Sequence, residues 1–491
     1  MAEHWANLDL HLDLNLDATG LGRSLERALR AAVRDGRLPP GTRLPSSRAL
    51  AADLGIARNT VADAYGQLTA EGWLSARTGA GTWVRDVFQG GGPVYPGGRP
   101  PGTPRLRLDG ARATGGTAAP MPTAGAARFD LHPGVPDLSA FPRREWVAAA
   151  RRALASSPDH VLNYPDPRGL PRLREALAGY LARARGVSAD PELIVVCAGF
   201  NHGLALLSEV LAARGARAAA VESYGLREHR AIVSHGGLRL APLPLDADGA
   251  IPDAAVLADA GAALLTPAHQ FPLGMTLAPA RRRAFAEWAA DTGAVLIEDD
   301  YDGEFRYDRH PVGAMQALAP DHVVYGGTAS KALAPGLRLG WLAVPGRLLD
   351  EVVAAARLAG GSPDTISQLT LAEFITSGGY DRRVRHARLA YRRRRDHLVS
   401  ALGRTVPRAR VTGIAAGLHA LAELPPGIAE SSAIIGSERR GVAVSGLTLY
   451  DAGAGQHPPA LVVGYATPPP HAFTAAVARL CAALADPARD G

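Results

Sequence analysis

Five short runs of apolar residues, separated by stretches with helical spacing, constrain the fold of this 491-residue chain most strongly. The runs are continuous rather than alternating, which is typical of strands buried on both faces of a parallel sheet. We therefore predict a mostly parallel α/β sheet that helices cover on both sides. The five runs occupy residues 193–197, 218–221, 263–265, 294–297 and 322–325.

Composition divides the chain into three parts. Residues 89–127 are rich in Gly, Pro, Ala, Thr and Arg with few large apolar side chains, so we predict a flexible linker over 87–127. The part before it, 1–86, is predicted to be a separate small module that begins with a strand-like alternation at 8–16. The part after it, 128–491, is predicted to contain a large α/β region at about 128–377 and a small α+β region at about 378–491.

The N-terminal module has the spacing of a helix-turn-helix. One helix is capped near Ser46 and ends at Gly55, and a second begins near Arg58. The apolar spacing leaves the start of the second helix exposed, as in a recognition helix that enters the major groove. A hairpin wing is predicted from Trp73 to Val84. The expected DNA contacts are Ser46, Ser47, Arg48, Arg58, Asn59, Thr60, Arg77 and Thr78.

The local sequence of this module indicates a DNA partner, and its charge permits one. Residues 21–85 hold ten arginines and five acidic residues, and the runs 35–48 and 58–72 resemble the winged helix-turn-helix of GntR-type regulators. That resemblance implies binding to double-stranded DNA. Ala62 departs from the wider superfamily, in which some members place a DNA-contacting arginine there. The alternative from the residues alone is a helical dimerisation module with solvated arginines.

Lys331 is the single lysine among the 53 lysine and arginine residues of the chain. A guanidinium stays protonated, whereas a desolvated lysine amine can lose its proton and form a Schiff base with an aldehyde. Thr328, Ser330 and Arg338 lie close by in the sequence and suit the phosphate of such an aldehyde. This combination indicates pyridoxal 5'-phosphate (PLP) as cofactor. The alternative is that one surface lysine survived an arginine bias by chance.

Further groups for the same cofactor follow predicted strands. Asp299 comes after the strand at 294–297, where open α/β sheets bind ligands. Its carboxylate can pair with the pyridine nitrogen while Tyr301 bonds the ring hydroxyl, and Asp300 is expected to be structural. The turn at 197–203 leads into a helix whose first amides can cradle a phosphate. The expected phosphate contacts are Gly199, Phe200, Asn201, Thr328, Ser330 and Arg338.

Four segments, at 164–174, 266–274, 298–307 and 326–340, resemble fold-type I aminotransferases. Joined to the winged helix, they resemble the MocR/GabR family of regulators. The resemblance implies that Lys331 forms the Schiff base with PLP, that Asp299 meets the ring nitrogen and Tyr301 the ring hydroxyl, and that Arg338 binds the phosphate. It also implies that Tyr224 stacks on the ring and that the protein is a homodimer.

Two departures from the aminotransferase pattern bear on the chemistry. Phe271 stands where aminotransferases commonly place asparagine, and His269 and Gln270 are nearby polar candidates. Val462 stands where they carry an arginine for the substrate carboxylate. Valine cannot form that bidentate ion pair. A standard α-amino acid is therefore a weaker candidate for the ligand.

The remaining sequence features exclude several classes of site. Cys197 and Cys481 lack disulfide or metal-ligand spacing, so we expect both to be reduced and buried and predict no metal site. The isolated histidines, His202, His229 and His419, are expected to be structural. The arginine-rich stretch at 382–395 is expected to be a solvated helix face, with auxiliary DNA contact as the alternative. No apolar run approaches the ~20 residues of a membrane span, so we expect a cytoplasmic protein.

These features predict a PLP-dependent, DNA-binding transcriptional regulator. The aminotransferase-like part would sense an amine, an amino acid or PLP itself through Lys331 and change how paired winged helices hold DNA. Two alternatives stay open. One is a PLP-dependent aminotransferase that carries a DNA-binding module, and the other is a regulator whose large domain is a dimerisation platform without cofactor.

Overall fold

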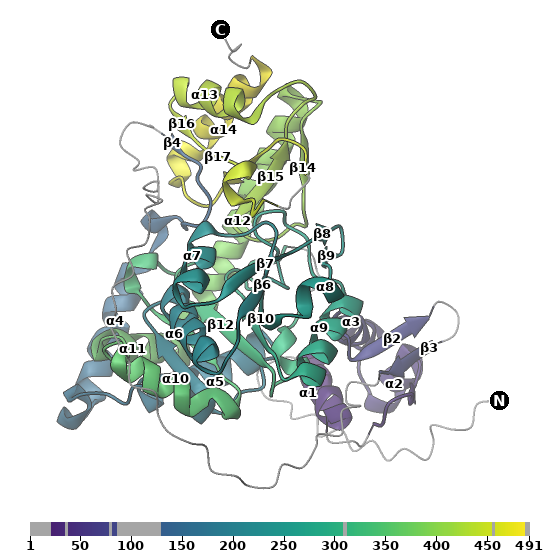
Figure 1. Ribbon diagram of the computed structural model, residues 1–491, viewed down its shortest axis with the longest axis vertical. Coiled ribbons are helices and arrows are strands. Elements are labelled where there is room, and N and C mark those ends of the chain that lie inside the picture. The colour runs from purple at the N-terminus through teal and green to yellow at the C-terminus, as the bar shows by residue number, and fades with distance from the viewer. Residues whose placement is uncertain are drawn as a thin grey trace.

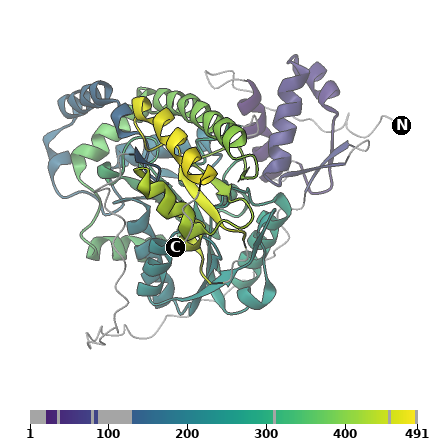
Figure 2. The same ribbon diagram turned by 90° about the horizontal axis from the view of Figure 1, so that it is seen from above.

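The computed structural model describes residues 21–34, 38–77, 81–85, 129–307, 312–453 and 457–486 (Figure 1). The predicted strand at 8–16, the predicted linker at 87–127 and Thr78 lie outside these residues. Three parts follow one another along the described chain. They are an N-terminal head, a large domain around a seven-stranded sheet, and a small C-terminal domain (Figures 1 and 2).

The head, residues 21–85, is a winged helix. Ser46 caps the second helix by accepting a hydrogen bond from the Ala49 amide, and Gly55 ends it with a φ of 63°. A three-stranded sheet in the order β1-β3-β2 forms the wing, so the predicted helix-turn-helix and hairpin are confirmed. The elements are α1 (Leu21–Arg34), β1 (Arg43–Leu44), α2 (Ser47–Leu54), α3 (Arg58–Ala70), β2 (Leu74–Arg77) and β3 (Gly81–Val84).

A seven-stranded sheet in the order β5-β13-β12-β11-β10-β6-β7 forms the centre of the large domain. Neighbouring strands are parallel except where β13 pairs antiparallel with β12 and β5. The predicted, mostly parallel sheet is therefore confirmed. Its strands are β5 (Ile194–Cys197), β6 (Ala218–Glu222), β7 (Arg239–Leu243), β10 (Ala260–Leu265), β11 (Val295–Asp299), β12 (Val323–Thr328) and β13 (Gly340–Ala343).

Alternate residues of these strands enter different apolar clusters. Val195 and Ile297 pack in one cluster, and Val196 and Leu296 pack in clusters on the opposite face. This division explains the continuous apolar runs, because every second side chain needs a helix on its own side. The surrounding helices are α4 (Arg143–Ser156), α5 (Pro171–Ala184), α6 (Phe200–Ala213), α7 (Arg227–His235), α8 (Ala254–Leu257), α9 (Pro279–Thr292), α10 (Gly346–Leu358) and α11 (Thr365–Thr376).

The small domain combines an antiparallel sheet in the order β14-β15-β18-β17 with three helices. A parallel pair, β4 (Phe129–Asp130) with β16 (Val442–Ala443), brings the first described residues after the head into this domain. The other elements are α12 (Gly379–Thr405), β14 (Arg410–Thr412), β15 (His419–Glu423), α13 (Glu430–Arg439), β17 (Ser445–Gly446), β18 (Ala460–Gly464) and α14 (Pro470–Ala485).

Short elements complete the described chain. Cys197 and Cys481 are free and buried, as predicted. Within the described ranges, every helix is too short or too polar to span a lipid bilayer. The short elements are the strands β8 (Leu245–Asp246) and β9 (Gly249–Ala250) and the 3-10 helices η1 (Leu138–Ala140), η2 (Asp159–Leu162), η3 (Pro191–Leu193), η4 (Met315–Leu318), η5 (Pro335–Leu337) and η6 (Leu447–Tyr450).

The arginine-rich helix α12 corrects one expectation, because two of its arginines are buried rather than solvated. Arg383 donates to the Ala332 carbonyl oxygen. Arg394 donates to the carbonyl oxygens of Tyr465 and Ala466 and to the Asp137 carboxylate at 2.9 Å. A separation of eleven residues is about three helical turns, so both side chains point to the same inner face. The other arginines of this helix, including Arg382, Arg385, Arg392 and Arg393, are exposed or partly exposed.

Candidate functional site

Lys331 lies in the turn after β12, at the edge where the parallel strands end. Its Nζ atom donates a hydrogen bond to the Gly134 carbonyl oxygen at 2.6 Å. Burial lowers the pKa of this amine, while the nearby carboxylates of Asp299 and Asp302 oppose the shift. A lowered pKa increases the unprotonated fraction of the amine, which is the form that attacks a carbonyl carbon.

Asp299 is the last residue of β11, the strand beside β12 in the sheet, and it is 4% exposed. Among the residues that the structure describes, its carboxylate accepts no hydrogen bond, and the Nδ1 atom of His229 lies 3.7 Å away. Burial raises the pKa of Asp299 well above its usual range, although Lys331 favours the ionised form. A buried carboxyl group without a donor suits a protonated ring nitrogen that a ligand would bring.

His229, on α7, supports the site behind Asp299. Its Nε2 atom lies 3.1 Å from Asn201 Oδ1, and its ring centre lies 5.2 Å from that of Phe200. Burial, with a smaller effect from Lys331, lowers the pKa of His229 to about 3, so the ring is neutral near pH 7. The Asn201 side chain is therefore engaged with His229, and the backbone of Phe200 and Asn201 in the first turn of α6 remains the part suited to a phosphate.

Tyr301 belongs to a buried polar cluster with His269, Asp302 and His419. The Nδ1 atom of His269 lies 2.8 Å from Asp302 Oδ2 and 3.2 Å from the Tyr301 hydroxyl. The His419 ring centre lies 5.1 Å from that of His269. His269, Asp302 and His419 could each direct one ligand atom at a cation, since these atoms lie within 4.8 Å of one another. Because His269 is already bonded to Asp302, we interpret the cluster as a support for the Tyr301 hydroxyl.

Gly199 and Arg338, two of the expected phosphate contacts, lie close together. Gly199 precedes α6 with a φ of 86°, and a β-carbon there would lie 3.4 Å from the Arg338 guanidinium. Arg338 itself is exposed and has a φ of 50°. Thr328 Oγ1 donates to Ser330 Oγ at 2.8 Å, so these two hydroxyls lie together. Both residues are close to Lys331 in the sequence. A helix N-terminus, a guanidinium and hydroxyls are the groups that bind phosphate oxygens.

Tyr224, Phe271 and Val462 share one apolar cluster, against which Tyr301 packs. Val462 is fully buried in β18, and the Phe271 ring centre lies 5.0 Å from that of Tyr450. The Tyr224 hydroxyl accepts a hydrogen bond from the His457 amide at 3.2 Å. Phe271 and Val462, which depart from the aminotransferase pattern, therefore lie in one cluster beside Tyr301. The small domain contributes Val462 to this cluster. Every member of this cluster is uncharged, so it offers no ion pair to a ligand carboxylate.

Several buried residues support this site although no pattern in the sequence marked them. Arg185 binds the Asp300 carboxylate through two nitrogens, at 2.5 and 3.1 Å, and the Tyr325 hydroxyl donates to the same carboxylate. Asp300 is therefore structural, as predicted. Glu222 accepts from the Thr266 hydroxyl, and burial raises the pKa of Glu222 to about 7. These pairs join residues 25 to 115 positions apart, so no local spacing could reveal them.

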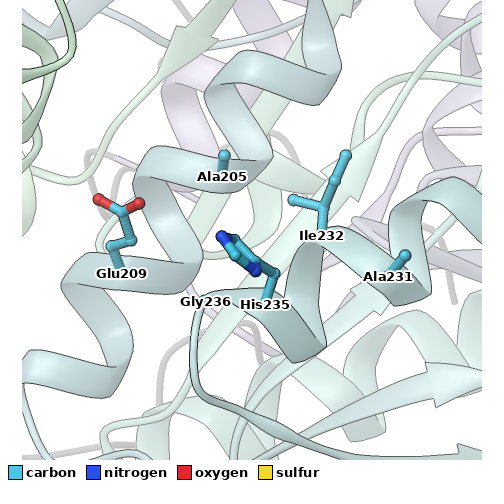
Figure 3. A pocket seen from close by; sticks show the side chains of 6 residues that line it. All are labelled: Ala205, Glu209, Ala231, Ile232, His235 and Gly236. Carbon is cyan, nitrogen blue, oxygen red and sulfur yellow. The ribbon is translucent and has the colours of Figure 1, made fainter. Parts of the chain in front are cut away.

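A hollow between α6 and α7 is separate from the site (Figure 3). It has a volume of about 360 Å³, and its walls lie beyond the first turn of α6, away from Gly199. It therefore adds nothing to the chemistry around Lys331. Its lining residues are Ala205, Glu209, Ala231, Ile232, His235 and Gly236.

The start of α3 presents the expected DNA-reading residues to solvent. Arg58 and Asn59 are exposed in its first turn, and Thr60 is partly exposed. The start of α2 lies on the same head, with Arg48 exposed. This arrangement matches a recognition helix that enters a groove with its N-terminal residues. The α2 contacts expected from the sequence are Ser46, which caps the helix, Ser47 and Arg48.

The two strands of the wing belong to the described residues, and residues 78–80 between them do not. Strands β2 and β3 pair antiparallel from Leu74 with Val84 to Arg77 with Gly81. The Arg77 backbone therefore ends β2, while its side chain and Thr78 lie outside the described residues. Their expected DNA contacts stay predictions.

Two protein families match consecutive parts of the chain. The family described as bacterial regulatory proteins, gntR family, matches residues 21–84. The family described as aminotransferase class I and II matches residues 130–452. The first match covers the head, and the second covers the large domain and most of the small one.

Known proteins are similar over most of the chain. The HTH-type pyridoxine biosynthesis transcriptional regulator PdxR of Corynebacterium glutamicum is 34% identical over 441 residues, covering 89% of this chain and 90% of that protein. The probable rhizopine catabolism regulatory protein MocR of Rhizobium meliloti is 34% identical, covering 77% of this chain and 76% of that protein. Among solved structures, an archaeal alanine:glyoxylate aminotransferase superposes with a TM-score of 0.66 at 26% identity, covering 73% of this chain and 91% of that one.

Proposed function

The chain belongs to the MocR/GabR family of transcriptional regulators, in which a GntR-type winged helix is joined to an aminotransferase-like domain, and from that premise we propose that it senses its effector through PLP held at Lys331. One observation carries the proposal. Lys331 is a partly buried amine with a lowered pKa, next to a buried Asp299 that lacks a hydrogen-bond donor among the described residues. Both belong to a domain that is joined to a DNA-reading head.

The described residues fit PLP group by group. The Asp299 carboxyl would pair with the ring nitrogen, the Tyr301 hydroxyl would bond the ring hydroxyl, and Gly199 with Arg338 would hold the phosphate. When bound, PLP supplies an aldehyde that reacts reversibly with amines. The chain's own part is to keep the Lys331 amine partly unprotonated, to orient the ring through Asp299 and Tyr301, and to exclude water by burial.

The effector class follows from the wall around Val462. The side chains of this apolar cluster are uncharged and include Phe271 and Tyr450, whereas the neighbouring Arg230 guanidinium donates to the Tyr450 carbonyl oxygen. A ligand carboxylate buried against these side chains would lose its hydration without gaining an ion pair from them. A buried charge without a partner costs about 3–5 kcal/mol. We propose an amine without an α-carboxylate, or PLP itself, as the effector. The name of the PdxR relative, which refers to pyridoxine biosynthesis, supports PLP.

The DNA partner is proposed to be a pair of half-sites that two heads read. A homodimer supplies two copies of the α3 start, where Arg58 and Asn59 are exposed. Dimers of such heads bind half-sites separated by whole turns of the double helix, about 34–36 Å each. The Lys331 site would then change the relative arrangement of the two heads when its ligand changes.

The test combines cofactor loading with DNA binding. Purified protein is mixed with PLP, its visible absorption is recorded, and borohydride is added to attach the cofactor covalently to its lysine. We expect peptide mapping to place the attached group on Lys331, and Lys331→Ala to abolish both the attachment and the visible band. Binding to the protein's own upstream DNA is then measured with and without PLP and a panel of amines. We expect the wild type to respond to at least one of these ligands and Lys331→Ala to respond to none.

Two outcomes contradict the proposal. Absence of a borohydride-fixed group on Lys331 would favour a domain without cofactor. DNA binding that is identical under every condition, together with steady transfer of amino groups to a keto acid, would favour the tethered aminotransferase.

A further inference from the structure

Two loops of the large domain bring His269 and Asp302 together beside Tyr301. His269 lies in the loop after β10, and Asp302 follows Tyr301 in the loop after β11. The Arg306 guanidinium joins the two loops by donating to the Ala268 carbonyl oxygen at 3.1 Å. His269 and Asp302 are both buried. The pair is therefore held in place and shielded from bulk water.

The Nδ1 atom of His269 carries a proton. It lies 2.8 Å from Asp302 Oδ2 and 3.2 Å from the Tyr301 hydroxyl oxygen. An ionised carboxylate can only accept hydrogen bonds, so the shorter contact requires a donor at Nδ1. The longer contact brings the same N–H group close to the Tyr301 oxygen. Asp302 therefore selects the form of the His269 ring that presents an N–H group, and not a lone pair, to Tyr301.

The Tyr301 hydroxyl has one proton to donate, and two acceptors can compete for it. Burial raises the pKa of Tyr301 well above its usual range, so the hydroxyl keeps its proton near pH 7. The charge of Asp302 and its hydrogen bond with Tyr301 raise this pKa further, which makes Asp302 one acceptor. The ring oxygen of PLP is the other. The His269 N–H group weakens the first, because it already occupies Asp302 Oδ2.

Gly417 of the small domain fits closely against the pair. It has a φ of 75°, and a β-carbon there would lie 2.6 Å from His269 Nδ1 and closer still to Asp302 Oδ2. Its carbonyl oxygen accepts hydrogen bonds from the Tyr307 and Tyr465 hydroxyls. A side chain at this position would push His269 and Asp302 apart. The contact therefore requires glycine for its conformation and for its lack of a side chain.

His419 lies beside the pair without adding a charge. Its Nε2 atom lies 3.2 Å from the Pro272 carbonyl oxygen, and its ring centre lies 5.1 Å from that of His269. Burial lowers the pKa of His419 well below its usual range, so the ring is neutral near pH 7. Other titratable groups that face the Tyr301 and Asp302 side chains are Asp299, Glu222, Lys331, Tyr307 and Tyr465.

We propose that His269 and Asp302 are positioning residues that direct the Tyr301 proton toward the ring oxygen of the cofactor. Asp302 holds the His269 N–H group in place, and that group keeps Asp302 from drawing the Tyr301 proton away. This role rests on the proposed function, because the ring oxygen belongs to PLP. A directed O–H donor stabilises the ring oxygen as an anion, so the pair helps to set the pH at which bound PLP loses a proton.

The test is a pH titration of the visible absorption of the full-length protein loaded with PLP. This absorption changes when the bound cofactor loses a proton, so its midpoint reports how strongly the ring oxygen is held as an anion. In His269→Leu, Asp302 loses its N–H donor and takes the Tyr301 proton. We expect the midpoint to rise by about one pH unit, a tenfold change in the proton equilibrium. The matched control is His235→Leu, at an exposed histidine on α7, and it should keep the wild-type midpoint.

Two amide variants separate the position of the donor from a general disturbance of the buried cluster. The amide nitrogen of His269→Asn is two bonds from Cβ, as Nδ1 is, whereas that of His269→Gln is three bonds from Cβ, as Nε2 is. We expect His269→Asn to keep the wild-type midpoint and His269→Gln to shift as His269→Leu does. Equal shifts in the two amide variants would show that only a disturbed cluster is being measured, and would overturn the proposal.

A double variant tests whether the pair acts through Tyr301. In a Tyr301→Phe background the O–H donor is absent, so we expect His269→Leu to cause no further shift of the midpoint. A shift of the original size in that background would mean that His269 acts by charge alone, which contradicts the proposal. An unchanged midpoint in His269→Leu itself overturns the positioning role and leaves PLP sensing at Lys331 intact. Absence of a PLP absorption band in the wild type defeats the proposed function, and this role with it.

Discussion

The head and the large domain expose their functional residues to opposite degrees. In the head, Arg58 and Asn59 are adjacent in the sequence and exposed at the start of one helix. In the large domain, Asp299 is 4% exposed, and Lys331 is bonded to Gly134, which is 197 residues away. A surface site can be altered with little effect on folding, whereas a substitution in a buried site changes ligand binding, stability or both. The DNA-reading and ligand-sensing functions should therefore respond differently to substitution.

The largest expected effect is confined to the head. The double variant Arg58→Ala with Asn59→Ala removes two side chains suited to bidentate base contacts, each worth about 1–3 kcal/mol. We expect a loss of about 4 kcal/mol in binding to the protein's own operator DNA, measured by titration at fixed salt. The midpoint of thermal unfolding should stay within the error of the wild type, because both side chains are exposed.

Arg393→Ala is the matched control for this loss. Arg393 is an exposed arginine on α12, outside the head. We expect its removal to leave operator binding unchanged. An equal loss of affinity in Arg393→Ala would mean that DNA runs over α12 and would break the separation between the two regions.

The two neighbouring arginines of α12 sharpen the contrast between exposed and buried residues. Arg394 is buried and bonded to Asp137, and it lies 5.3 Å from the Phe473 ring centre. Arg394→Ala leaves Asp137 buried without its partner, which costs about 3 kcal/mol of unfolding free energy. Arg393→Ala should change the unfolding free energy by less than about 0.5 kcal/mol. Denaturant titration of both variants measures the difference, and similar midpoints would contradict the buried role of Arg394.

The sequence predicted the elements of the fold better than their internal charge network. The apolar runs and the glycine turn at Gly55 predicted the parallel sheet and the helix-turn-helix, because local periodicity determines these features. The pairing of Arg185 with Asp300 and the burial of Arg394 were not predicted. Both depend on residues brought together by the fold, and a buried arginine has the same sequence signature as an exposed one.

The candidate site shows the same limit on a smaller scale. Lys331, Asp299 and Tyr301 stood out because their residue types have a specific chemistry at strand ends. His229 and His419 looked like isolated histidines, yet the structure places His229 beside Asp299 and His419 beside His269. Their roles arise from tertiary contacts, so only the folded chain reveals them.

Asp299→Asn tests whether the buried Asp299 carboxyl group contributes to ligand binding and not to the stability of the unliganded fold. The amide removes a carboxyl group whose pKa is raised well above its usual range by burial, so the variant should lose no stability without ligand. The same change removes the charge that would pair with the PLP ring nitrogen. A charge-assisted hydrogen bond contributes about 1.5–3 kcal/mol, so we expect PLP affinity to fall about tenfold to a hundredfold. Unchanged affinity, measured from the visible absorption, would contradict the role assigned to Asp299.

The smallest expected effect is a pH dependence that belongs to the large domain. Burial raises the pKa of Glu222 from 4.5 to about 7, despite its bonds from Thr266 and Gln270. Between these two values the folded state keeps a proton that the unfolded state has released, so the unfolding free energy falls as pH rises. Glu222→Gln removes this proton and should flatten that fall by about 1 kcal/mol between pH 5.5 and 6.5, since one pH unit contributes at most 1.36 kcal/mol. Glu175→Gln, an exposed substitution on α5, is the matched control and should keep the wild-type slope. Equal slopes in all three proteins would show that Glu222 is ionised in the folded state. The burial of Glu222 would then give the large domain no pH dependence of its own.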